Sequence, residues 1–222
     1  MVEKLTYLEV NPAVLPRACI IWLHGLGANA DDFMPLVPQL QLPDDLGIRF
    51  VFPQAPDRAV TLNMGYEMPA WYDITELTLG SEQDEVGIRR AQQQLDRLID
   101  NEIKHGIASN NIVLAGFSQG GALALHTALR FPRPLAGVIA LSSYLPLADF
   151  VAAEQNKVNQ DLPIFMAHGF DDMILPLAAA EISSEYLTRL NYSVVFKTYA
   201  MAHEVCFAEI TDISTWIQRV LS

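Results

Sequence analysis

Six short apolar runs, separated by more polar stretches, predict β-strands. Several are continuously apolar and rich in β-branched residues, as in N-I-V-L-A-G and G-V-I-A-L-S. Runs of this kind are typical of parallel strands that are covered on both faces. The predicted strands comprise residues 19–23, 49–52, 111–115, 137–141, 164–167 and 193–199.

Helical periodicity alternates with these strands. Between Asp84 and His105, apolar residues recur at spacings of three and four, which places them on one face of an amphipathic helix. Similar patterns predict helices over residues 120–129, 177–190 and 204–220. Strands that alternate with helices indicate βαβ units, so we expect an α/β fold whose mostly parallel, twisted sheet carries helices on both faces.

Composition limits the class of protein. The chain has 222 residues, of which 51% are hydrophobic and 18% charged. This length fits a single domain spanning residues 1–222, and this composition supplies a substantial core. The formal net charge of −12 argues against a nucleic acid or an anionic membrane as partner, because their phosphates would be repelled. At most, we expect transient contact with a neutral lipid surface; the oligomeric state is not predicted.

The chain shows no pattern of export or of membrane insertion. Its first residues, M-V-E-K-L-T-Y-L-E-V, lack the apolar segment of a secretory signal, and no run approaches the roughly 18 apolar residues of a spanning helix. Cys19 and Cys206 do not make a disulfide framework, and no C-x-x-C pair or histidine-rich cluster suggests a structural metal. We therefore expect a cytoplasmic, reduced protein.

The strongest chemical motif is G-F-S-Q-G at residues 116–120, between a predicted strand and a predicted helix. A tight strand-to-helix turn of this type holds its serine in a strained backbone, with flanking glycines that keep neighbouring atoms clear. Ser118 then stands beside the helix N-terminus, which favours developing negative charge. The motif in this setting predicts a nucleophilic serine.

Chain order selects the partners of that serine, because an acid and then a histidine follow a nucleophile in this turn. His126 lies about two turns along the same helix and cannot reach the Ser118 hydroxyl. His168 precedes the candidate acids, which leaves His203 as the base. Asp171 and Asp172 both follow the strand at 164–167, and spacing alone does not choose between them.

The turn after the first predicted strand, residues 25–30, fits G-x-G-x-x-A and so permits two interpretations. It could bind a dinucleotide, or it could offer a backbone N–H to a reacting carbonyl oxygen. A dinucleotide fold needs an acid at the end of the next strand, where Pro53 and Gln54 stand instead. Asp31 and Asp32 would also face the pyrophosphate. Both observations argue against a dinucleotide site.

Together, these motifs resemble those of the carboxylesterase, lysophospholipase and acyl-protein thioesterase family of α/β hydrolases. The resemblance covers nearly the whole chain. It rests on W-L-H-G-L-G-A, F-P-Q-A-P, M-P-A-W-Y-D-I, G-F-S-Q-G-G-A-L-A-L, H-G-F-D-D-M-I-L-P and Y-A-M-A-H-E-V-C.

The resemblance implies an α/β-hydrolase fold and a Ser118–His203–Asp172 triad. Its H-G-x-x-D pattern selects Asp172 over Asp171, although Met173 stands where the family often has proline. It also implies that the backbone N–H groups of Leu26 and Gln119 form the oxyanion hole. The reaction implied is hydrolysis of carboxylic esters or thioesters through an acyl-enzyme, without a metal or organic cofactor. Small esters, lipids and acylated proteins are the implied substrates.

Two other functions compete with this interpretation. One is a catalytically silent binding protein on a hydrolase scaffold, and the other is a small serine peptidase. Peptidases of this fold usually carry an added cap or propeller domain, for which this chain is too short.

The substrate site is predicted from apolar residues in irregular segments. Residues 142–162 are too few for a cap domain, and residues 53–80 follow neither helical nor strand periodicity, which suggests a functional loop. We expect apolar residues in these segments to contact an acyl chain. Alternatively, Trp71 and Tyr72 pack the loop onto the body. The candidate acyl contacts are Met64, Trp71, Leu77, Leu79 and Leu145.

Overall fold

The computed structural model describes residues 4–76 and 81–222, and within them seven strands form one central sheet. The strand order is β1-β3-β2-β6-β7-β8-β9, and every neighbouring pair is parallel except β1 with β3. The strands are β1 Tyr7–Val10, β2 Ala18–Leu23, β3 Ile48–Pro53, β6 Ile112–Phe117, β7 Gly137–Leu141, β8 Pro163–Gly169 and β9 Ser193–Tyr199.

All six predicted strands are confirmed, with ends that differ by up to two residues. The sequence pattern missed β1, which is short, partly exposed and lies at the sheet edge. It also missed a separate antiparallel hairpin, β4 Asp57–Val60 and β5 Tyr66–Pro69, inside the segment predicted as a loop. These four-residue strands are mostly exposed or half-buried, so they lack the continuous apolar run that marks the parallel strands.

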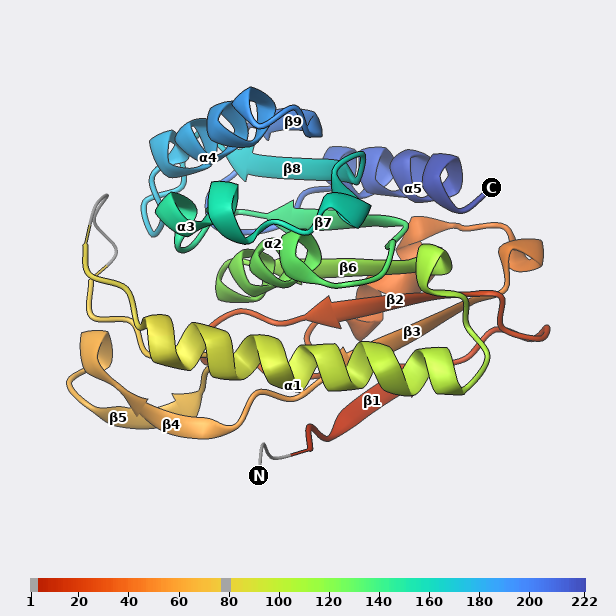
Figure 1. The fold of residues 1–222 in the computed structure, drawn as a ribbon, viewed down its shortest axis with the longest axis horizontal. Helices are drawn as coiled ribbons and strands as arrows, with labels where there is room; N and C mark the ends of the chain where they lie inside the picture. Colours follow the sequence, from red (N-terminus) through yellow and green to blue (C-terminus); the bar gives the residue numbers. More distant parts are fainter. Residues whose placement is uncertain (1–3, 77–80) are drawn as a thin grey trace.

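Helices cover both faces of the sheet, as expected. Figure 1 looks onto the face covered by α1 and α2. Cys19, Ile21 and Leu23 of β2 pack toward that face, whereas Ile20 and Trp22 pack on the opposite one, beneath α5. The helices are α1 Glu85–Lys104, α2 Gln119–Arg130, α3 Ala148–Glu154, α4 Leu177–Arg189 and α5 Phe207–Leu221.

The connection between β7 and β8 contains only α3 and one 3-10 turn, Lys157–Asn159, so the sheet carries no cap domain there. Within the described residues, no helix has the length and apolarity needed to cross a bilayer. Parallel strands β6, β7, β8 and β9 end at the same edge of the sheet, where pairs such as Phe117 with Leu141 and Gly169 with Tyr199 lie in register. Ligand sites of parallel α/β sheets lie outside this edge.

Candidate active site

Ser118 stands in a strained turn between β6 and α2. Its backbone has φ 52° and ψ −119°, a conformation that residues with a Cβ rarely adopt. A Cβ on Gly116 would lie 2.3 Å from the carbonyl carbon of Gly120, and one on Gly120 would lie 2.5 Å from the carbonyl oxygens of Leu23 and His24. Both glycines of the G-x-S-x-G motif are therefore required by close backbone approach.

Asp172 and His203 are in direct contact. The Oδ2 atom of Asp172 lies 2.6 Å from Nδ1 of His203, while Oδ1 accepts the backbone N–H groups of Ile174 and Leu175 at 2.9 and 2.8 Å. The side chain of Asp172 is fully buried, whereas Asp171 is exposed. Of the two candidate acids, the structure thus places Asp172 against the histidine.

His203 lies over the turn that carries Ser118. Its ring centroid is 4.7 Å from that of Phe117, the residue before the serine. The loop that carries Asp172 also bonds to the loop that carries His203, because the backbone N–H of Asp171 donates to the carbonyl of Met201 at 3.1 Å. The structure therefore gathers Ser118, Asp172 and His203 at the carboxyl ends of β6, β8 and β9.

The turn after β2 lies beside Ser118. A Cβ on Gly25 would be 3.5 Å from Cβ of Ser118. The N–H of Gly27 donates to Pro69 and that of Ala28 to Gly25, whereas the N–H of Leu26 has no acceptor among the described residues. Gln119 begins α2, and the N–H groups of a first helical turn have no intrahelical partner. Two backbone donors are thus available next to the serine hydroxyl.

His24 fixes this turn, a role that sequence reasoning missed. Its side chain is buried, and burial lowers the pKa of its imidazole. The backbone N–H of Ala55 donates to Nε2 at 3.1 Å, so the ring carries its proton on Nδ1 and donates to the carbonyl of Gly25 at 2.7 Å. The H-G pair and the nearby Q-A-P motif were the available signals in the sequence.

Trp71 is a buried brace, which corrects the prediction that it contacts an acyl chain. Its side chain is fully buried, and Nε1 donates to the carbonyl of His24 at 2.9 Å. The side-chain amide of Gln119 holds the same segment, since it accepts from the N–H of Trp71 and donates to the carbonyl of Tyr72. The alternative interpretation, in which Trp71 and Tyr72 pack the loop onto the body, fits this arrangement.

His168 lies behind the carboxylate of Asp172. Its buried Nε2 is 2.9 Å from the carbonyl oxygen of Leu175 and 3.2 Å from Oδ2 of Asp172. A ring that donates to a carbonyl and also approaches the carboxylate helps to fix the loop that carries the acid. The sequence excluded His168 as the base, and the H-G-x-x-D spacing was the one signal for this contact.

A cavity of about 280 Å³, lined by both apolar and acidic side chains, opens between the segment after Tyr72, the start of α3, and α4. Leu145, one of the candidate acyl contacts, lines it. No residue of the Ser118, Asp172 and His203 group lines the cavity, but two lining residues bond directly to the site: Tyr72 through its carbonyl to Gln119, and Leu175 through its N–H to Asp172. The other apolar lining residues are Ile74, Ala148, Ala179, Ile182 and the rings of Tyr144 and Tyr186.

The remaining predicted acyl contacts have different outcomes. Met64 occupies the turn between β4 and β5 with 92% of its surface exposed and does not line the cavity, so its acyl contact stays a prediction. Its neighbour Met68 is the hairpin methionine next to the site, with Sδ 3.6 Å from where a Cβ on Gly27 would lie. Leu77 and Leu79 lie outside the described residues and remain predictions.

The strand order, the strained serine turn and the carboxylate–histidine contact at one sheet edge define an α/β hydrolase. Residues 8–221 match the family described as Phospholipase/Carboxylesterase. Acyl-protein thioesterase 1 of Mycosarcoma maydis is 38% identical to this chain over an aligned region that covers 98% of each protein. The protein of the same name from Yarrowia lipolytica is 36% identical over 91% of each. The solved structure of Arabidopsis thaliana SOBER1 has a TM-score of 0.89 and 32% identity, and covers 93% of this chain and 100% of its own. The chain belongs to the phospholipase/carboxylesterase family and is a serine hydrolase.

Proposed function

We propose that this hydrolase cleaves carboxylic esters and thioesters of acyl chains, with Ser118 as nucleophile, His203 as general base and Asp172 as its orienting acid. The observation that carries the proposal is the 2.6 Å contact between Asp172 and His203 beside the Ser118 turn. Because Asp172 accepts from Nδ1, the histidine presents Nε2 to the serine.

The reaction has two steps. His203 takes the Ser118 proton as the hydroxyl oxygen attacks the acyl carbonyl, and the tetrahedral oxyanion accepts the N–H groups of Leu26 and Gln119. Each such donor lowers the activation free energy by on the order of 3 kcal/mol. His203 then protonates the leaving alcohol or thiol, and the same groups activate water against the acyl-enzyme.

The cavity next to the site indicates the class of substrate. A cavity of about 280 Å³ is close to the lower end of the range for small-molecule sites, and the aliphatic and tyrosine side chains in its lining suit an acyl chain. The absence of a cap between β7 and β8 leaves space above the described site for a bulky carrier. Relatives named acyl-protein thioesterase make an acylated protein the leading candidate for that carrier, with lipids and small esters as further substrates. We place this activity in the cytoplasm and in a single domain.

The test compares wild type with a variant that lacks the proposed nucleophile, on a panel of substrates. Wild type and Ser118→Ala are assayed with p-nitrophenyl esters from acetyl to palmitoyl, an S-palmitoyl peptide and a lysophospholipid, and both are treated with a fluorophosphonate. Turnover and labelling of wild type alone support the proposal. A wild-type protein that neither turns over any member nor labels is a silent binding protein, and hydrolysis of the peptide backbone instead would make it a peptidase.

A further inference from the structure

The wall of the cavity carries two paired hydroxyl groups, from Tyr72 and Tyr144. Their oxygens are 3.0 Å apart, and both residues line the cavity. Both also belong to segments that bond to the Ser118 turn. The carbonyl of Tyr72 accepts from Gln119, and Ser143, which precedes Tyr144, donates from Oγ to the carbonyl of Ser118 at 2.8 Å. The pair is therefore fixed relative to the reacting serine.

The hydrogen-bond capacity of this pair is not used up. Each phenol has one donor proton, and one hydrogen bond between the two uses a single proton. Among the described residues, neither hydroxyl has another partner. Tyr72 is 1% exposed whereas Tyr144 is half-buried, so the pair meets the cavity mainly through Tyr144. Burial raises the pKa of both phenols, so each keeps its proton. One O–H donor and several lone pairs thus remain unmatched in a wall that combines aliphatic, aromatic and acidic side chains.

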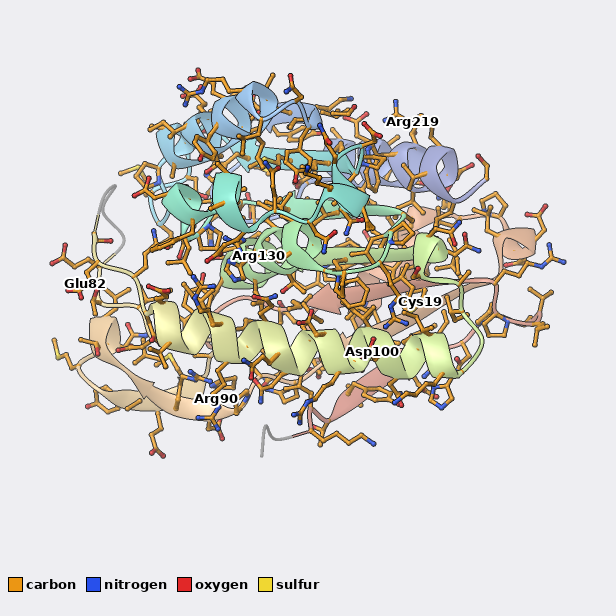
Figure 2. The ribbon with its side chains drawn as sticks, in the orientation of Figure 1. Cys19, Glu82, Arg90, Asp100, Arg130 and Arg219 are labelled. Carbon is orange, nitrogen blue, oxygen red and sulfur yellow. The ribbon has the colours of Figure 1, made fainter. Side chains whose placement is uncertain are left out.

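A saturated acyl chain gives this donor no acceptor. A buried polar group without a partner is costly, whereas an oxygen on the chain would accept the free O–H. The charged side chains that line the cavity are all acidic: Asp73, Glu76, Glu82, Asp84 and Asp149. One of them, Glu82, lies at the end of the molecule where the β4–β5 hairpin and the start of α1 lie (Figure 2). An anionic chain end would be repelled, so the chain oxygen must belong to a neutral group.

We propose that the Tyr72–Tyr144 hydroxyl pair makes the cavity selective for acyl chains that carry a neutral oxygen, as an ether, hydroxyl or ketone, at one position along the chain. This selectivity rests on the proposed acyl hydrolysis at Ser118. A pair that served only to join its two segments would leave the enzyme indifferent to where the chain carries oxygen.

The experiment compares chains of equal length. In a series of p-nitrophenyl esters, an ether oxygen replaces one methylene at successive positions, starting far enough from the carbonyl to leave its reactivity unchanged. For each position, the ratio of kcat/KM for the oxygen-bearing ester to that for the all-methylene ester is measured. Wild type is compared with Tyr72→Phe, Tyr144→Phe and the control Tyr192→Phe, which removes a hydroxyl bonded to Gln155 rather than one in the cavity wall.

We expect one position, or two adjacent ones, at which the wild-type ratio exceeds that of its neighbours by about three- to tenfold, the usual range for one neutral hydrogen bond. Both cavity variants should abolish this maximum, and Tyr192→Phe should keep it. A ratio that is equally low at every position in all four proteins overturns the proposal, as does a maximum that survives in both cavity variants. Wild-type turnover of the all-methylene ester reports separately on the proposed hydrolase activity.

Discussion

Asp172 touches His203 through Oδ2, while the adjacent Asp171 points its carboxylate to solvent. Asp172→Asn should therefore lower kcat by about a thousandfold or more, because an amide neither selects the required imidazole tautomer nor stabilises its charge. Asp171→Asn, the matched control, should stay within about threefold of wild type, as expected for an exposed group. The measurement is kcat of both purified variants on one short ester; the reverse ranking would assign the acid to Asp171.

Substitutions at Ser118 should separate chemistry from backbone strain. Ser118→Ala and Ser118→Gly both remove the hydroxyl, so each should lose more than nine-tenths of wild-type kcat, a barrier increase above about 1.4 kcal/mol. At φ 52° and ψ −119°, glycine avoids a strain on the order of 1–3 kcal/mol that alanine keeps. Ser118→Gly should therefore unfold at higher urea concentration than Ser118→Ala.

The control for this pair is Ser193→Ala, at an exposed serine at the start of β9. It should retain full activity. Retention of more than a tenth of kcat by Ser118→Ala would remove Ser118 from the mechanism. Equal stability of the alanine and glycine variants would limit the strain at this position to the roughly 0.4–1 kcal/mol by which glycine favours the unfolded chain.

The sequence predicted the parallel sheet well because its central strands are buried on both faces and therefore continuously apolar. The same rule could not find β1 or the β4–β5 hairpin, whose residues are partly exposed. The G-F-S-Q-G motif singled out Ser118, and chain order singled out His203 as its candidate base. It could not separate Asp171 from Asp172, because the choice depends on two backbone N–H groups that hold one carboxylate in the buried loop.

Trp71 and Met64 show a second limit of sequence patterns. An apolar residue in an irregular segment can be wall, core or exposed, and its neighbours in space decide which. Trp71 belongs to the core, where its indole N–H donates to the carbonyl of His24, a residue far away in sequence. Met64 is exposed because it occupies a hairpin turn that the pattern did not predict.

The side chain of Gln119 should support stability as well as activity. Gln119→Met leaves the N–H of Trp71 and the carbonyl of Tyr72 without their partners, each at a cost of about 1–3 kcal/mol. We expect a lower free energy of unfolding by urea, together with reduced kcat as the segment next to the oxyanion turn loosens. Gln93→Met, at an exposed position of α1, is the control for the substitution itself. Two variants with the same unfolding midpoint would rule out this bracing role.

The cavity should set a chain-length preference. Each buried methylene contributes up to about 0.8 kcal/mol, so log(kcat/KM) of wild type should rise with acyl length until the cavity is full. Ala148→Phe introduces a ring at a lining position of α3 and should level this rise at shorter chains. Ala152→Phe adds the same ring at an exposed position of α3 and should follow wild type. Parallel profiles for Ala148→Phe and wild type would place the acyl chain elsewhere.

Glu209, in the first turn of α5, should make the protein less stable at alkaline pH. Its side chain is buried, and within the described residues neither carboxylate oxygen has a well-formed hydrogen bond. Burial raises the pKa of this carboxyl to about 8 from an ordinary value of 4.5, an effect that the nearby backbone N–H of Cys206 only partly offsets. Between these two values the folded protein keeps a proton that unfolding releases, so the free energy of unfolding falls as pH rises through this window.

Glu209→Gln should remove that dependence, because an amide stays neutral at every pH. Its Tm relative to that of wild type should increase from pH 5 to 8.5. Its free energy of unfolding should exceed that of wild type by on the order of a few kcal/mol once the wild-type carboxyl is ionised. Glu185→Gln, at an exposed position of α4, removes the same charge without the burial and should run parallel to wild type. Thermal unfolding of the three proteins across this range is the measurement. A Glu209→Gln curve parallel to wild type would mean that the carboxyl is already ionised in the folded protein, held by a partner that compensates for its burial.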